Sequence, residues 1–268
     1  EIRPLVSRRK SGDLMKSEQI KNWSPPLTWQ EKVKGILPGS WYLNHLLKKH
    51  LRKGEPELKL LPFLVDKGKD AVDVGANKGV YSRALSELTH TVYAFEPNPK
   101  MYKILCSGKT KKTKAYQVAL SDQSGIAKLL IPHNLEKDTY SNQGASLSST
   151  KVSGLHRAIE VESKTLDSYD LKNIGFLKID VEGFELSVIE GASQTIAFNK
   201  PTMLVELEER HTDIPIENLV GRIEKLGYKA YFLIHTNLTP FSQFNAEKMH
   251  RDAIGTENYI YNFIFLPV

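Results

Sequence analysis

Short apolar runs alternate with segments of helical periodicity along most of the chain. Runs rich in Val, Ile, Leu, Phe and Tyr predict strands at 70–74, 91–95, 114–120, 127–132, 159–163, 174–181, 202–207, 228–234 and 259–268. Apolar residues spaced three or four positions apart predict helices at 41–53, 80–88, 101–108, 182–192 and 214–227. This alternation predicts an α/β fold in which helices cover both faces of a mostly parallel sheet.

Two long connections interrupt this pattern. The last two predicted strands are joined by residues 235–258, which show no helical periodicity. Without a helix between them, these strands most simply pair antiparallel at one edge of the sheet. The other connection, residues 133–154, is rich in Asn, Ser and Gly, and its length is unusual unless it is functional or disordered.

The composition is that of a globular protein large enough to bury a full core. The chain has 268 residues, of which 40% are hydrophobic, 25% charged and 9% aromatic. Its one cysteine, Cys106, excludes an intrachain disulfide and a cysteine-based zinc site. No uncharged apolar run approaches the ~20 residues of a membrane-spanning helix, and residues 1–16 lack the apolar segment of a signal peptide. We therefore expect a reducing, cytoplasmic setting.

The positive charge is concentrated at the N-terminal end. Residues 1–60 hold 13 Lys and Arg against 6 Asp and Glu, whereas the rest of the chain holds 24 against 25. We therefore divide the chain into a basic N-terminal arm with a helix, 1–57, and a second domain, 58–268. The basic segment is either a solvated surface or a contact for an anionic partner such as a membrane surface. The balanced charge of 58–268 argues against a platform for nucleic acid.

A glycine-rich turn after the first predicted strand is the main candidate binding site; it reads Asp73-Val-Gly75-Ala-Asn77-Lys-Gly79. Ligands of doubly wound sheets bind at the carboxyl ends of the strands. Glycines let a ligand approach the backbone, and the helix that follows offers free N–H groups. Glu96 ends the next strand, where an acidic residue accepts hydrogen bonds from the ribose of an adenosine cofactor. The alternative is a plain tight turn with an unrelated glutamate.

The residues of this turn favour S-adenosylmethionine over a nicotinamide dinucleotide. The dinucleotide pattern G-x-G-x-x-G needs glycine at position 77 and glycine or alanine at position 80, where the chain has Asn77 and Val80. The Asp73 carboxylate would repel a pyrophosphate and attract a cationic ligand. The Tyr-x-x-x-Lys pair expected of a nicotinamide-dependent oxidoreductase is also missing from the sequence.

Five segments together carry a resemblance to a known family: DVGANKGVYS, YAFEPNP, VALSD, LKIDVEGFE and MLVELEERH. In this order, over about residues 70–211, the chain resembles the FkbM family of S-adenosylmethionine-dependent O-methyltransferases, and LKIDVEGFE is the most specific segment. The resemblance implies a class I methyltransferase (Rossmann-like) fold, with a seven-stranded sheet whose last strand is antiparallel. It also implies methylation of hydroxyl groups, often on sugars. Residues 1–57 have no recognised counterpart.

The resemblance also assigns cofactor-binding roles to particular residues. The methionine part would be cradled by Asp73, Gly75, Asn77 and Gly79, and the ribose would be bound by Glu96. The adenine would be bordered by Asn98, Ala119, Leu120 and Asp122.

Acidic residues follow two neighbouring predicted strands, and we expect them to face the transferred methyl group. Asp180 and Glu206 end these strands, and Glu182 and His211 come shortly after. An alcohol must lose its proton during attack, which a carboxylate or His211 would accept directly. Alternatively, Asp180 and Glu206 hold Mg²⁺ or Mn²⁺, which acidifies the hydroxyl. The other interpretation is that Glu182 and Glu185 cap and solvate a helix, and that His211 is a surface histidine.

These observations predict an S-adenosylmethionine-dependent O-methyltransferase acting on a hydroxyl of a sugar, a glycan or a glycosylated metabolite. Residues 133–154 would form part of a lid over the acceptor site, and the basic arm would shape that site or dock an anionic partner. The alternative outside enzymes is an adenosine-ligand or RNA-binding module with the basic N-terminal segment as its contact surface.

Overall fold

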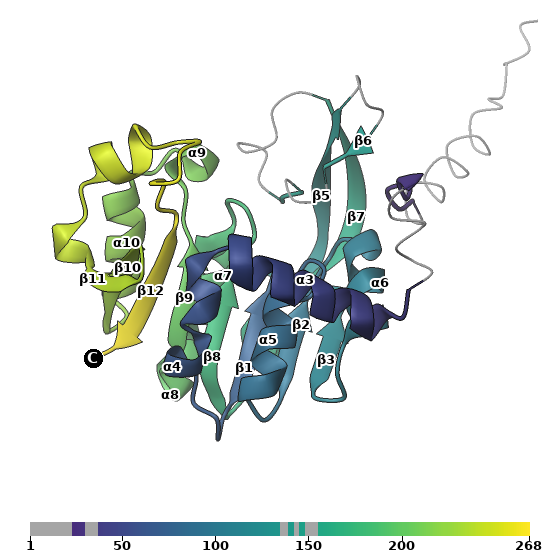
Figure 1. The fold of residues 1–268 in the computed structure, drawn as a ribbon, viewed down its shortest axis with the longest axis horizontal. Coiled ribbons are helices and arrows are strands. Elements are labelled where there is room, and N and C mark those ends of the chain that lie inside the picture. Colours follow the sequence, from purple (N-terminus) through teal and green to yellow (C-terminus); the bar gives the residue numbers. More distant parts are fainter. Residues whose placement is uncertain (1–22, 30–36, 135–138, 142–144, 148–154) are drawn as a thin grey trace, which may run out of the picture.

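The computed structural model describes residues 23–29, 37–134, 139–141, 145–147 and 155–268 (Figure 1). Its main element is an eight-stranded sheet with the order β11-β10-β12-β9-β8-β1-β2-β3. In chain order the strands are β1 (Asp70–Val74), β2 (Val92–Phe95), β3 (Thr113–Tyr116), β8 (Ile174–Ile179), β9 (Thr202–Glu206), β10 (Tyr228–Ile234), β11 (Asn237–Pro240) and β12 (Asn262–Pro267). Neighbours from β3 through β9 are parallel, and β12 runs antiparallel between β9 and β10. The predicted α/β fold is confirmed.

The C-terminal part of the sheet confirms one prediction and differs from another. The last two predicted strands pair antiparallel, as β10 and β12. The sheet has eight strands rather than seven, because Asn237–Pro240 forms β11 on β10 within the segment expected to be a loop. The edge strand is therefore β11, and β12 lies inside the sheet between β9 and β10. Phe263, Ile264 and Phe265 in β12 have no exposed surface, so this strand needs neighbours on both sides, whereas the mostly exposed β11 tolerates an edge. The same segment also forms the short helices η3 (Phe241–Gln243) and η4 (Glu247–Arg251).

Helices cover both faces of the sheet. On one face lie α7 (Glu185–Glu190), α8 (Ser193–Asn199) and α10 (Ile216–Glu224), and the other carries η1 (Pro56–Lys59), α4 (Leu61–Leu64) and α5 (Val80–Leu88). Successive side chains of a strand point to opposite faces. In β1, Val72 and Val74 therefore join the first apolar layer, whereas Ala71 joins the second and Asp73 contacts α5. This alternation decides which polar side chains at the strand ends lie together.

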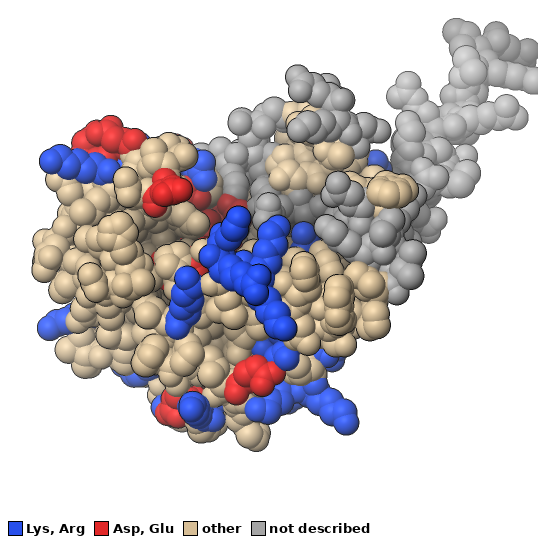
Figure 2. Space-filling view, viewed as in Figure 1, with Lys and Arg blue, Asp and Glu red and all other residues tan. Residues whose placement is uncertain are grey.

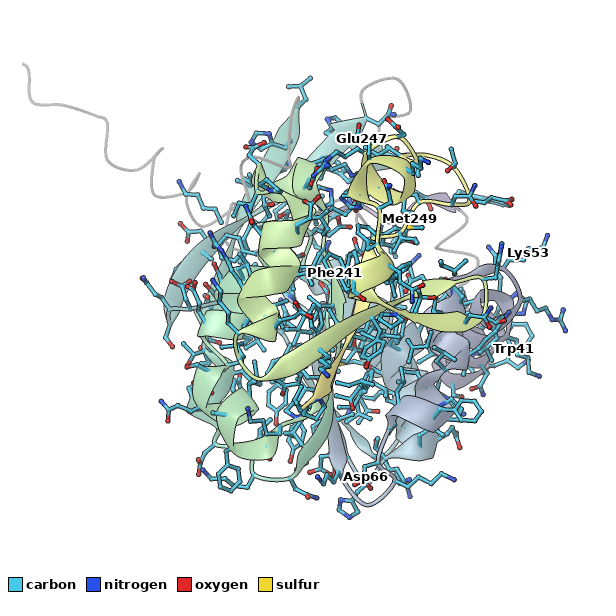
Figure 3. All side chains as sticks on the ribbon, turned by 90° about the vertical axis from the view of Figure 1, so that its left-hand side faces the viewer. Trp41, Lys53, Asp66, Phe241, Glu247 and Met249 are labelled. Carbon is cyan, nitrogen blue, oxygen red and sulfur yellow. The ribbon has the colours of Figure 1, made fainter. Side chains whose placement is uncertain are left out.

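The predicted N-terminal helix is confirmed as α3 (Gly39–Lys53), which crosses the front of the molecule in Figure 1 and packs against α5 and α6 (Pro99–Gly108). Its buried residue is Leu43, whereas Trp41 is 55% exposed. Figure 3 places Trp41 and Lys53 on the outer side of the helix. Lys and Arg side chains gather over α3 in Figure 2. Most of the predicted basic arm, 1–22 and 30–36, lies outside the described residues.

A second sheet stands beyond the carboxyl ends of the main strands (Figure 1). It has the order β4-β7-β5-β6 and consists of β4 (Ala119–Leu120), β5 (Gly125–Asn134), β6 (Thr139–Tyr140) and β7 (His156–Lys164). The strands predicted at 127–132 and 159–163 are thus an antiparallel hairpin outside the main sheet. Within the described residues, no helix is long and apolar enough to cross a membrane.

Candidate active site

A cavity of about 250 Å³ lies at the carboxyl ends of β1, β2, β8 and β9. It brings together most of the residues predicted to bind a cofactor, namely Asp73, Gly75, Asn77, Glu96, Ala119 and Leu120. The acidic residues expected on the acceptor side also line it: Asp180, Glu182 and Glu206. Its remaining walls include Leu46, His50 and Glu55 from α3 and the chain after it, and Leu129, Ala145, Ser146 and Leu147 from beside the hairpin.

Asp73 is the most deeply buried acid of this cavity, with no exposed surface. Its Oδ2 accepts a hydrogen bond of 2.5 Å from the Ser82 hydroxyl at the start of α5. Its Oδ1 has no hydrogen-bond partner among the described residues. Burial raises the pKa of Asp73, although the nearby Lys178 opposes this. An unpaired buried oxygen on a cavity wall is costly by itself, so it fits a ligand that donates a hydrogen bond or carries positive charge.

The two glycines of the turn have different tasks. Both have a positive φ, +76° at Gly75 and +90° at Gly79, which favours glycine. A Cβ at Gly75 would lie 1.8 Å from the Asp180 carbonyl oxygen, so this glycine allows the ends of β1 and β8 to approach. A Cβ at Gly79 would lie 2.5 Å from Leu105 Cδ1. Gly79 does not line the cavity, and its place in the turn serves the packing of α6.

Glu96 joins the turn after β1 to the turn after β2. Its two carboxylate oxygens accept backbone hydrogen bonds of 2.7 Å, from the Asn77 N–H and from the Asn98 N–H. The side chain is 6% exposed, and burial raises its pKa to about 7. Asn98 itself caps α6 by accepting a 3.0 Å hydrogen bond from the Lys100 N–H, and it does not line the cavity. The predicted Asp122 is exposed and also lies outside the lining.

Lys178 is a site residue that the sequence pattern did not reveal. It belongs to the apolar strand β8, is 3% exposed, and donates a 2.8 Å hydrogen bond from Nζ to Asp180 Oδ2. Its ammonium group lies 4.6 Å from the centre of the Tyr81 ring. Burial alone would lower the pKa of Lys178, but the charges of Asp180 and Asp73 raise it above its ordinary value. Lys178 therefore stays charged and holds Asp180 in place.

Three carboxylates converge beside this lysine. Oxygens of Asp180, Glu182 and Glu206 lie within 4.8 Å of one another, as expected for acids at the ends of adjacent strands. Burial raises the pKa of Glu206 well above its ordinary value, and the charge of Asp180 adds to this. Oxygen ligands in this arrangement suit Mg²⁺ or Mn²⁺. However, the ammonium group of Lys178 already compensates part of the charge that an ion would neutralise.

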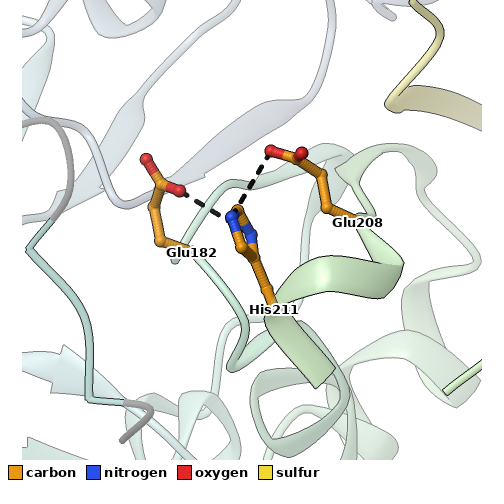
Figure 4. A group of neighbouring side chains, drawn as sticks. All are labelled: Glu182, Glu208 and His211. Carbon is orange, nitrogen blue, oxygen red and sulfur yellow. Dashed lines mark ion pairs between the residues drawn. The ribbon is translucent and has the colours of Figure 1, made fainter. Parts of the chain in front are cut away.

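His211 is buried, which corrects its interpretation as a surface histidine. It belongs to the short helix α9 (Glu209–Thr212), is 4% exposed, and lies between two glutamates (Figure 4). Its Nδ1 is 3.8 Å from Glu182 Oε2, and its Nε2 is 3.7 Å from Glu208 Oε1. Burial alone would raise the pKa of Glu208, but hydrogen bonds from Arg210 and Tyr259 lower it. Glu208 is thus an ionised partner for His211 behind the cavity wall.

Two further expectations concern the edge of the site. Glu185 accepts a 2.9 Å hydrogen bond from the Gly183 N–H, as a cap would, but it is buried rather than solvated. Burial raises the pKa of Glu185 to about 7.

In the proposed lid, residues 135–138, 142–144 and 148–154 lie outside the described residues. Of the described part, Ser146 lines the cavity and donates a 2.5 Å hydrogen bond to the Glu182 carbonyl oxygen.

A doubly wound, mostly parallel sheet with an inserted antiparallel strand is the class I methyltransferase fold. A family model described as the methyltransferase FkbM domain matches residues 73–230, which is more than half of the chain. The chain therefore belongs to this family, which confirms the resemblance inferred from its motifs.

Solved structures provide more distant comparisons. Methyltransferase FkbM from Methylobacillus flagellatus KT is 16% identical with a TM-score of 0.49, and the match covers 85% of this chain and 54% of that one. The chain therefore spans about half the length of that protein. A putative methyltransferase from Streptococcus mutans, in complex with SAH, is 11% identical with a TM-score of 0.45, and the match covers 79% of this chain and 96% of that one. No curated protein matches the chain.

Proposed function

We propose that the protein is an S-adenosylmethionine-dependent O-methyltransferase that acts on a hydroxyl group of a sugar, a glycan or a glycosylated metabolite. The observation that carries this proposal is the shared cavity. Asp73 and Glu96 line one part of it, and a cluster of acids able to accept a proton lines another. Transfer between two bound reactants depends mainly on such alignment.

The cofactor residues fit the chemistry of S-adenosylmethionine. Asp73 offers an unpaired buried oxygen to a cationic ligand, and Glu96 offers a carboxylate to the ribose hydroxyls. The lining positions of Gly75 and Asn77 would hold the methionine part, and Ala119 would border the adenine. When bound, S-adenosylmethionine supplies a methyl group on a positively charged sulfur. The proposed contacts do not include Gly79, whose Cβ position faces Leu105 rather than the cavity.

The acceptor proton would leave through Glu182 and His211. Glu182 lines the cavity, and its carboxylate lies at ion-pair distance from the His211 imidazole. The Glu208 carboxylate on the other side of the ring would balance the positive charge of an imidazole that accepts this proton. Asp180, held by Lys178, would accept a hydrogen bond from the hydroxyl and orient it. The proton that the acceptor hydroxyl loses as it attacks the methyl group would therefore be held by Glu182 and His211 inside the protein.

The metal-assisted version is supported by a separate observation, the convergence of three carboxylates at Asp180, Glu182 and Glu206. In that version Asp180 and Glu206 are ligands of Mg²⁺ or Mn²⁺, and Glu182 or His211 is the base. The two versions differ in one measurable respect, which is the effect of a chelator on turnover.

The experiment is methyl transfer from labelled S-adenosylmethionine to a panel of glycosides, with and without EDTA, together with calorimetry of cofactor binding. Asp180→Asn keeps the shape and the hydrogen bond from Lys178 but removes the charge. We expect this variant to bind the cofactor normally and to lose about 10²–10⁴-fold in turnover. Glu190→Gln, at an exposed carboxylate outside the cavity, is the matched control and should behave as the parent. No cofactor binding by the parent, or full turnover by Asp180→Asn, would overturn the proposal; loss of turnover in EDTA would select the metal version.

A further inference from the structure

The charges around the acceptor end of the cavity do not balance. Glu55, Asp180, Glu182 and Glu206 all line this region. Lys178 is the cation whose ammonium group is hydrogen bonded to one of them, Asp180. The cofactor carboxylates on the other walls add to the negative side. Asp180 is paired with Lys178, and Glu182 lies at ion-pair distance from His211. Among the described residues no ion pair joins Glu55 or Glu206, so negative charge is in excess at these two carboxylates.

Glu206 is the centre of this excess. Its carboxylate receives no hydrogen bond from any described donor, and no cation forms an ion pair with it among the described residues. Asp180, Glu208 and Glu55 act on it with like charge, and the cations Lys178 and Arg210 act on it with opposite charge. A cation placed among these carboxylates would be attracted by each of them. Such an arrangement is typical of a functional site rather than of a structural ion pair.

Glu55 also lines this cavity. It follows α3, and its Oε2 accepts a 2.6 Å hydrogen bond from the Tyr81 hydroxyl. This bond fixes the glutamate on the cavity wall, and its other oxygen, Oε1, accepts no hydrogen bond from a described residue. Glu55 and Glu206 thus reach one end of the cavity from separate parts of the chain.

We propose that the acceptor carries a protonated amine, as an amino sugar or an amino alcohol does, and that Glu206 and Glu55 bind this ammonium group beside the hydroxyl to be methylated. The inference rests on the proposed function, and it narrows the acceptor to a class. An ammonium group supplies the missing charge and hydrogen-bond donors that suit carboxylate oxygens. An acceptor with a carboxylate or phosphate at this end would meet like charge and be rejected.

This arrangement also directs the reaction to oxygen. Carboxylates beside an amine favour its protonated form. A protonated amine has no lone pair with which to attack the methyl group. The hydroxyl next to it keeps its lone pairs. Asp180 would orient this hydroxyl, and Glu182 would accept its proton as the new oxygen–carbon bond forms and the sulfur–carbon bond breaks.

The test measures binding and does not depend on turnover. Methyl glucosaminide and methyl N-acetylglucosaminide differ in whether the nitrogen is charged, and methyl glucuronide carries the opposite charge. Each glycoside is titrated into the 268-residue protein saturated with S-adenosylhomocysteine, and binding is followed by NMR saturation transfer at neutral pH. A charge-assisted hydrogen bond predicts a preference of about ten- to a hundredfold for the amine over the acetamide. Glu206→Gln and Glu55→Gln should each lower this preference, whereas Glu190→Gln should leave it unchanged.

Each result supports or overturns the inference. A preference for the amine that falls in Glu206→Gln supports it. Equal binding of amine and acetamide, no binding of either, or a preference that survives both substitutions overturns it. If Mg²⁺ or Mn²⁺ binds the parent and not Glu206→Gln, an inorganic ion fills this end of the cavity and the inference is also wrong. Failure of S-adenosylhomocysteine to bind would instead contradict the proposed function, so the two are distinguishable.

Discussion

The proposed cofactor site can be tested through the protonation state of Glu96. Its carboxylate is 6% exposed, and burial raises its pKa to about 7, whereas its ordinary value is 4.5. The two oxygens already accept the N–H groups of Asn77 and Asn98. Ribose hydroxyls would add donors, which favour the ionised form. Cofactor binding should therefore draw a proton off Glu96, and affinity should rise with pH.

The size of this effect follows from the pKa. With a pKa of about 7 in the free protein, the ionised fraction is about 0.9 at pH 8 and about 0.1 at pH 6. If the cofactor binds only the ionised form, its affinity is about tenfold higher at pH 8, which corresponds to ~1.3 kcal/mol. In Glu96→Gln the side chain no longer titrates, so this part of the pH dependence should disappear. The variant should also bind more weakly at pH 8, because an amide cannot accept from every donor around it.

The assay is calorimetric titration of S-adenosylhomocysteine from pH 6 to pH 8 in the parent, Glu96→Gln and Glu185→Gln. Glu185 is the matched control, because it is also buried with its pKa raised to about 7 but does not line the cavity. The control should keep the pH dependence of the parent. The same slope in the parent and Glu96→Gln would refute the reasoning, as would a slope lost equally in both variants.

Two further predictions concern the stability of the site. Gly75→Ala should lower the free energy of unfolding by about 2–4 kcal/mol, because the new Cβ would lie 1.8 Å from the Asp180 carbonyl oxygen at a positive φ. Urea unfolding measures this loss, and a change under about 0.5 kcal/mol would contradict the prediction. Lys178→Met should destabilise the protein by about 3–5 kcal/mol at pH 8, because the buried Asp73 and the partly exposed Asp180 lose their cation. The loss should shrink at pH 5.5, because the raised pKa of Asp73 lets this carboxyl bind a proton in the folded state; an equal loss at both pH values would argue against this explanation.

Much of the fold could be read from periodicity, because local spacing reports which side of an element is buried. The strands of the parallel half and helices α3, α5 and α10 lie close to their predicted positions. Pairing between distant strands leaves no such local signal. The 127–132 and 159–163 strands were therefore found, but not their departure from the main sheet into a hairpin. The polar β11 was missed for the same reason, since its pairing with β10 makes it a strand.

The candidate site was likewise only partly predictable from the sequence. The sequence by itself determined the turn at Asp73, the acid at Glu96 and the acids that end β8 and β9, because these depend on residue type and on position at a strand end. The tertiary structure alone decided what surrounds them. Lys178 looks like one polar residue in an apolar strand until the sheet sets it beside Asp180. His211 looks exposed until Glu208 and Glu182 enclose it from separate segments. Charge balance, burial and the pKa of each group depend on distances between elements far apart in the chain, and only the packed fold sets those distances.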